Sequence, residues 1–178
     1  MNTKAISPVI ATVIIVSVAI AIAVAVAFWM TGITGLFTRY EKLDVINAYA
    51  IYNESVEGGT WALVLTVRNT GTSDITLDQL FINGKPFSTF SSSYELKATF
   101  LNSTSFKGIP SGAINVTKSD GDWAPGSTDK GTYPLHTGDE KTFVIPLCSK
   151  DDFKSGQIVE VKLHTAGGNE FPKSVQLP

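Results

Sequence analysis

The residues that most often carry chemistry are few in this chain and widely spaced. The two histidines, His136 and His164, do not form a pair with the spacing of metal ligands. Acidic side chains at 120–122 and 151–152 could bind calcium, but their spacing fits solvated turns better than an EF-hand loop. The sequence has no glycine-rich phosphate loop and no nucleophile motif. We therefore expect no enzyme, no bound metal and no cofactor.

Composition narrows the classes of partner and the sources of stability. The single cysteine, Cys148, cannot form a disulfide within the chain, and its place after an apolar run is typical of a small buried side chain. The 178 residues carry a net charge of −2 and no cluster of lysine or arginine, which argues against a nucleic-acid partner. Stability must therefore come from a packed core.

Three sequons for N-linked glycosylation begin at Asn53, Asn102 and Asn115. Three in 178 residues is close to chance for a chain rich in serine and threonine, so the motif alone is weak. On an extracellular domain, attached sugars would solvate a surface that carries little charge. We expect Asn102 and Asn115 to face solvent and to be the better candidates.

The elements that must position these residues begin with a long apolar segment. Residues 5–38 contain no charged side chain, and only two side chains between 9 and 30 are polar. From 18 to 27 isoleucine or valine alternates with alanine, which resembles a strand, but strands average about 5–6 residues and this run is far longer. A helix of this length crosses a bilayer core of about 30 Å. We predict a helix that resides in lipid or in the core of an assembly.

The residues before this run differ from a conventional secretory signal. Lys4 is their only charged side chain, the small residue Ala5 follows it directly, and no small-residue cleavage pattern follows the apolar run. A cut at this point would lie on the cytoplasmic side and leave the helix on the mature protein. Pro8 suits the first turn of a helix, with Ser7 as its N-cap.

The eight residues KAISPVIA, from Lys4 to Ala11, resemble the class III signal peptide and the start of the mature chain in archaeal type IV pilins. The resemblance extends over residues 4–44. Bacterial type IV pilins carry a glutamate where this chain has Ile10, and the Gly-Leu-Gly-Thr-like start usual in archaellins is absent. The resemblance is therefore to the pilins of the archaeal branch.

This resemblance implies a processing step and a set of partners. A membrane-embedded prepilin peptidase would remove residues 1–5 by cutting between Ala5 and Ile6, next to the basic Lys4. The precursor would reside in the cell membrane, and a cytoplasmic assembly ATPase and a membrane platform protein would then build a homo-oligomeric helical filament on the cell surface. The function implied is that of a structural pilin, which serves adhesion or surface contact.

In such a filament the N-terminal helices, expected over residues 6–42, form the core. Alanine at every second position would let their backbones approach closely, as small residues do in membrane helix packing. The residues expected in the filament core are Val9, Ile10, Val13, Ile14, Val16, Ala19, Ala21, Ala23, Ala25, Ala27 and Phe28. The alternative is a helix that stays in the membrane permanently and tethers the rest of the chain as an extracellular binding module of a membrane complex.

The rest of the chain, residues 43–178, shows short β-like runs separated by turns. We predict strands at 43–52, 61–67, 75–82, 142–147, 158–164 and 175–177, with a hairpin turn at Asn83-Gly84. Residues 87–133 are rich in Ser, Thr, Gly and Asn, and we expect an elaboration there with one or two short strands on the outer face. The predicted fold is α+β: a long N-terminal hydrophobic helix followed by an all-β, immunoglobulin-like sandwich. The pilin domain is commonly of that kind, and the segment 67–71, VRNTG, resembles a strand-turn often seen there.

Overall fold

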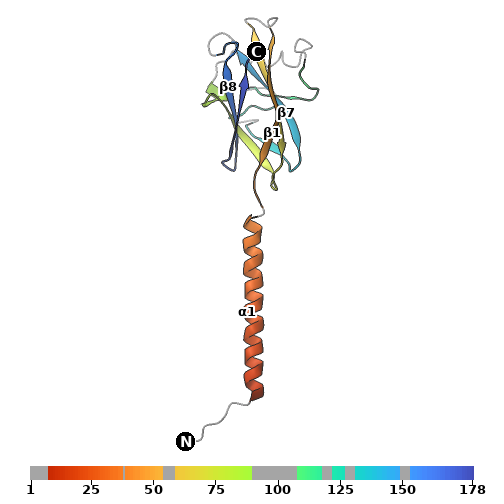
Figure 1. Ribbon diagram of the computed structural model, residues 1–178, viewed down its shortest axis with the longest axis vertical. Coiled ribbons are helices and arrows are strands. Elements are labelled where there is room, and N and C mark those ends of the chain that lie inside the picture. The colour runs from red at the N-terminus through yellow and green to blue at the C-terminus, as the bar shows by residue number, and fades with distance from the viewer. Residues whose placement is uncertain are drawn as a thin grey trace. The chain divides into compact units, whose positions relative to one another are not determined.

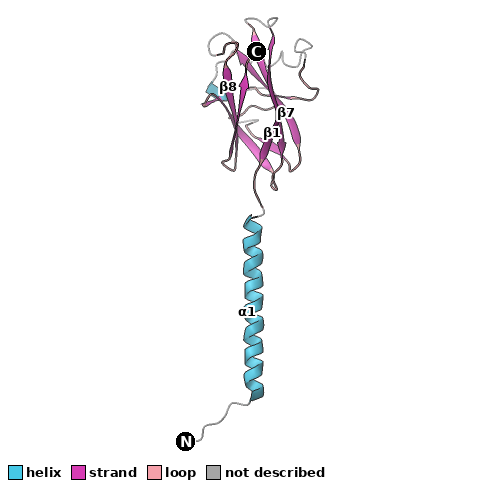
Figure 2. Cartoon of the chain, in the orientation of Figure 1, coloured by secondary structure: helices cyan, strands magenta, loops and turns pink. Residues whose placement is uncertain are grey.

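The computed structural model describes residues 8–37, 39–53, 59–89, 108–117, 122–126, 131–148 and 153–178. The chain divides into two compact units, Met1–Tyr40 and Glu41–Pro178, which are described one at a time. Among the described residues, the first unit contains an α-helix, and the second contains the strands and one short 3-10 turn (Figures 1 and 2).

The first unit contains a single uninterrupted helix, α1, from Pro8 to Phe37. Proline at the first helical position has no N–H to leave unpaired, and its fixed φ already suits a helix. The predicted helix is confirmed, but its expected end at residue 42 is wrong. Residues 39–42 are not helical, and the carbonyl of Lys42 accepts hydrogen bonds from Thr70 N and Gly71 N in the second unit. Glu41 and Lys42 thus belong to the second unit, and hydrogen bonds within that unit replace the helical pattern at Lys42.

The second unit is a sandwich of two sheets, as predicted. The first sheet has the order β1-β2-β7-β5 and contains β1 (Leu43–Asn53), β2 (Thr60–Asn69), β7 (Glu140–Cys148) and β5 (Ile114–Asn115). The second sheet has the order β4-β3-β8-β9 and contains β4 (Lys85–Pro86), β3 (Ile75–Ile82), β8 (Ile158–Thr165) and β9 (Glu170–Gln176). A further strand, β6 (Tyr133–Leu135), pairs with β3, and a 3-10 turn, η1 (Phe87–Thr89), follows β4.

The strand order confirms the immunoglobulin-like topology. The neighbours β1-β2-β7 correspond to strands A, B and E of that fold, and β3-β8-β9 correspond to C, F and G. The pairings β1-β2 and β2-β7 in the first sheet, and β3-β8 and β8-β9 in the second, are all antiparallel. The short strand β5 departs from the pattern, because it pairs with β7 in parallel.

The strands form where hydrophobic alternation meets a turn signal. In β8 every second residue is buried, which directs Val159, Val161 and Leu163 into the core. The predicted hairpin turn is confirmed: Asn83 and Gly84 have φ values of 50° and 76°, and both positions of a type I′ turn need positive φ.

The turn in the VRNTG segment is organised by one buried side chain, Asn69. Its Nδ2 donates to the carbonyls of Ser73 (3.0 Å) and Leu135 (3.1 Å), and its Oδ1 accepts from Gly71 N at 3.0 Å. Asparagine suits this position because its side-chain amide can donate to two backbone carbonyls and accept from one backbone N–H. The residue is fully buried, so these groups need such partners.

The elaboration between 87 and 133 does more than decorate the outer face. Its described part contains one short strand, β5, and the first residue of another, β6, within the one or two short strands expected, and it also contributes to the core. Trp123 is fully buried, with its ring centroid 5.3 Å from that of Phe143 and 6.3 Å from that of Tyr133. On the other face of the first sheet, Ile109 and Ala113 pack against buried residues of β2 and β7. Both faces of that sheet are therefore partly covered.

We predict that Trp123→Ala destabilises the β domain by about 3–5 kcal/mol, since it removes a buried aromatic side chain and leaves a cavity. Chemical denaturation of the detergent-solubilised chain measures this. The control is Ile158→Ala, at a side chain that is 65% exposed, with an expected change within about 0.5 kcal/mol. Equal effects of the two substitutions would contradict a core role for the elaboration.

Candidate functional site

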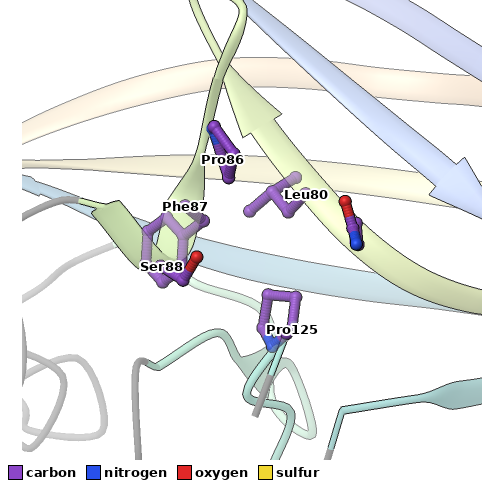
Figure 3. Close-up of a pocket in the computed structure, with 7 residues that line it drawn as sticks. Leu80, Pro86, Phe87, Ser88 and Pro125 are labelled. Atoms are coloured by element: carbon purple, nitrogen blue, oxygen red, sulfur yellow. The ribbon is translucent and has the colours of Figure 1, made fainter.

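The pocket formed by the second unit lies between β3, β4, η1 and residues 125–126 (Figure 3). Its volume is about 190 Å³, below the roughly 300–1,000 Å³ of typical small-molecule sites. Its lining consists of Gln79, Leu80, Pro86, Phe87, Ser88, Pro125 and Gly126. None of these side chains titrates near neutral pH. The pocket therefore has neither the size nor the groups of a catalytic site.

Each histidine is paired with an aspartate at or beside β3. His164 Nδ1 lies 2.6 Å from Asp78 Oδ1, and His136 Nδ1 lies 3.0 Å from Asp74 Oδ2. These pairs tie β8 and the turn after β6 to β3. Within the described ranges no group of three or more His, Cys, Asp or Glu side chains is placed to hold a metal ion. The histidines therefore cross-link strands in the described structure.

The pair between His136 and Asp74 changes the pKa of both groups. The hydrogen bond with Asp74 raises the pKa of His136, and attraction to Asp74 and Asp139 adds to the effect. The hydrogen bonds from His136 and from Thr137 N lower the pKa of Asp74. Both side chains are exposed, so salt screens their attraction.

The sequon for which the structure describes the asparagine side chain does not face solvent as expected. Asn115 lies in β5, is only 5% exposed, and its N–H donates to Asp122 Oδ2 at 3.1 Å. The expectation that Asn115 faces solvent is therefore wrong, because its neighbour strand β7 and the turn at Asp122 enclose it. Asn102 and the side chain of Asn53 lie outside the described residues, as does the side chain of Cys148.

The most unusual surface of the chain is that of α1. Between Pro8 and Gly35 no residue is buried within the chain, and large side chains are widely exposed, from Val9 at 69% to Phe28 at 76%. A contiguous apolar surface of this extent is far larger than the patches that monomeric soluble proteins expose. An apolar surface of this kind is typical of a helix that lipid or another protein covers.

Three polar side chains of α1 find their hydrogen-bond acceptors within the helix itself. Thr12 Oγ1 donates to the carbonyl of Val9 at 2.8 Å, Ser17 Oγ to that of Val13 at 2.7 Å, and Thr31 Oγ1 to that of Ala27 at 2.8 Å. These hydroxyl protons are used within the helix. A dry environment is therefore acceptable for α1, since polar groups without a partner are costly there.

The alternation of large and small residues gives α1 two faces that carry alanines, called the alanine faces here. A helix turns about 100° per residue, so residues two apart point about 200° apart and residues four apart share a face. One side therefore carries Ala19, Ala23 and Ala27, and the other carries Ala21 and Ala25. Small residues let a neighbouring backbone approach closely. Two opposite faces of the same helix thus suit close packing.

All eleven residues expected to form a filament core lie on α1 and are exposed in the single chain. The same surface includes the bulky residues between the alanines and continues to Trp29 and Met30, which that set omits although their apolar character was visible in the sequence. The expected processing residues, Lys4, Ala5 and Ile6, lie outside the described residues.

No protein-family model matches this chain, and none of the curated proteins is similar to it. The function of the chain therefore has to be inferred from its own residues. The helix is long and apolar enough to cross a membrane between Pro8 and Gly35. An apolar helix at the N-terminus is compatible with membrane anchoring or with a signal sequence.

We predict that the His136–Asp74 pair makes stability depend on pH. The raised pKa of His136 means that its stabilisation is complete below the ordinary value of 6.5 and is lost as the pH rises through the folded-state pKa. The lowered pKa of Asp74 adds stability above its ordinary value of 3.8, and this is lost as the pH falls through its folded-state pKa. The pair should stabilise most between these limits.

Thermal midpoints of wild type and His136→Gln, compared from about pH 5 to about pH 8.5, measure this effect. The wild type should have the larger advantage at the acid end, with a difference that shrinks toward alkaline pH and in high salt. Asp74→Asn should remove the same dependence. A difference between wild type and variant that is constant with pH would contradict the prediction.

Proposed function

We propose that this chain is the structural subunit of an extracellular filament of the type IV pilus kind, assembled through α1. The observation that carries the proposal is the continuous apolar surface of a 30-residue helix, which is not buried between Pro8 and Gly35 in the described part of the chain. In the precursor, lipid covers this surface. In the filament, neighbouring copies of α1 replace the lipid.

The length of α1 supports a filament over a permanent anchor. At about 1.5 Å per residue the helix is about 45 Å long, whereas the hydrocarbon core of a bilayer is about 30 Å thick. A permanent anchor therefore has to tilt, or leave about ten residues outside the hydrocarbon core. In a bundle of parallel copies, the whole length of the helix is buried against protein.

The two alanine faces support an extended array over a closed dimer. A subunit that contacts neighbours on opposite sides of its helix uses different surfaces for each contact. Contacts of this heterologous kind propagate into open helical filaments when the rotation between subunits does not close a ring.

Two edge strands of the β domain, β1 and β9, carry features that disfavour pairing with strands of other copies. The edge strand β1 has a bulge between Val45 and Asn47, and the edge strand β9 carries Pro172 and Lys173. Bulges, proline and lysine are devices that protect sheet edges from pairing with other strands. Assembly is thereby left to α1, and the domain forms the outer layer that serves adhesion or surface contact.

Negative-stain microscopy of material sheared from the cell surface tests the proposal. We expect thin filaments in which mass spectrometry detects this chain, and none on cells that lack its gene. The prepilin peptidase, assembly ATPase and platform protein implied by the resemblance should be needed for the filaments. Recovery of the chain in the membrane fraction alone would favour the tethered binding module instead.

Processing gives the next prediction. The order Lys4, Ala5, Ile6 places the cut after the small residue that follows the basic one. Intact-mass analysis of the chain from cells should show the loss of residues 1–5, with Ile6 at the new N-terminus. Substitution of Ala5 by a bulky residue should block the cut, and a mass that matches all 178 residues in filaments would refute it.

Close packing of the helices predicts that Ala23→Leu lowers filament yield while the chain stays in the membrane. The added volume meets a neighbouring backbone, and overpacking typically costs about 1–3 kcal/mol per site. Val24→Leu is the matched control, because position 24 lies outside both alanine faces. Ala23→Asp should abolish filaments, since a charge at a dry site costs at least about 2.5–3.5 kcal/mol.

Filament yield relative to the membrane-bound pool measures all three variants. A permanent anchor tolerates leucine at position 23, because leucine is at least as compatible with lipid as alanine is. Normal filament yield from Ala23→Leu would therefore refute the close packing described here.

A further inference from the structure

The first residue of the β domain, Glu41, is held by the hairpin turn between β8 and β9. Its Oε2 accepts hydrogen bonds from Thr165 Oγ1 at 2.7 Å and from Asn169 Nδ2 at 3.0 Å. Thr165 is fully buried and Glu41 is partly buried. Hydrogen bonds to an ionised carboxylate are among the stronger ones in proteins.

The turn is shaped around this carboxylate. A Cβ atom built on Gly167 would lie 2.8 Å from Glu41 Cδ and Oε2, closer than real Cβ contacts. The neighbouring Gly168 has φ of 85°, which explains that glycine by its backbone. Gly167 has no such φ, but a side chain there would have to move the Glu41 carboxylate from its present position.

The next residues are fastened to the turn between β2 and β3. The carbonyl of Lys42 accepts from Thr70 N at 2.9 Å and from Gly71 N at 3.1 Å. Asp44 Oδ2 accepts from Thr70 Oγ1 at 2.9 Å, and Lys42 Nζ lies 3.4 Å from the same oxygen. Residues 41–44 are thus tied to the β8–β9 turn of the second sheet and to the β2–β3 turn, which connects the two sheets.

We propose that Glu41 is a positioning residue, which locks the start of the β domain onto the β8–β9 turn and so fixes the point at which the chain leaves the domain. Any hinge between the two units is then confined to residues before Glu41. The role that we assign to this contact, to keep the outer layer of the filament ordered, rests on the proposed function. The lock itself is tested without filaments.

Limited trypsin digestion of the detergent-solubilised full chain measures how often the contacts of Glu41 and Lys42 open. Trypsin cuts after Arg39, before the lock, and after Lys42, whose carbonyl is hydrogen-bonded within it. Cleavage of a protected bond follows the population of the opened form. In the wild type we expect the cut after Lys42 to be much slower than the cut after Arg39.

Two variants weaken the lock without altering the sequence at either cleavage site. Gly167→Ala displaces the Glu41 carboxylate, and Asn169→Ala removes one donor. Each should raise the rate of cleavage after Lys42, relative to that after Arg39, by about tenfold, as expected for the loss of a hydrogen bond to a charged group. Ala166→Ser, in the same turn and exposed, is the control and should leave the ratio unchanged.

Arg68, within β2, shows whether a variant has simply unfolded, because cleavage there needs the sheet to open. An unchanged ratio of the two cuts in both variants would overturn the proposal, as would a rise that is matched by cleavage after Arg68. In filaments of Asn169→Ala, we expect a normal helical core and a blurred β layer in helical reconstructions. A failure of the wild type to form filaments would refute the proposed function and leave the digestion result standing.

Discussion

A helix whose apolar surface no described part of its own unit covers is the constraint on which the rest of this structure depends. The apolar surface of α1 has to be removed from water, and the hydrophobic effect that drives this is proportional to the area buried. The β domain is a separate compact unit, Glu41–Pro178. It therefore has to be stable by its own core.

The β domain meets that demand without a disulfide, through two sheets and one buried asparagine. Aromatic packing of Trp123 and Tyr133 on Phe143 fills the part of the sandwich next to the elaboration. Asn69 links the β2–β3 turn to β6, and the same turn receives the first residues of the domain. The β2–β3 turn is thus bonded both to β6 and to the first residues of the domain.

Prediction from the sequence succeeded where a single local signal was strong. The bounds of β3 agree with the prediction because alternating apolar residues run directly into Asn83-Gly84. It failed where tertiary contacts decide. Strand β9 begins five residues before its predicted start, because as an edge strand it buries few side chains and has little alternation. The burial of Asn115 and Trp123 depends on β7, a strand distant in sequence, and the lock at Glu41 depends on a turn more than a hundred residues away.

In the proposed filament, contact between apolar helices is weakly directional, so α1 alone would set the distance between copies better than their rotation. The alanine faces limit the distance between helices, because they define where backbones can meet. Rotation requires a rigid body attached at a fixed point. We propose that the hydrogen bonds of residues 41–44 to the β8–β9 turn and to the β2–β3 turn provide that point, and that the edge features of β1 and β9 disfavour competing contacts between strands. Order in an assembly of such subunits therefore depends on polar contacts in the β domain as much as on the apolar surface of α1.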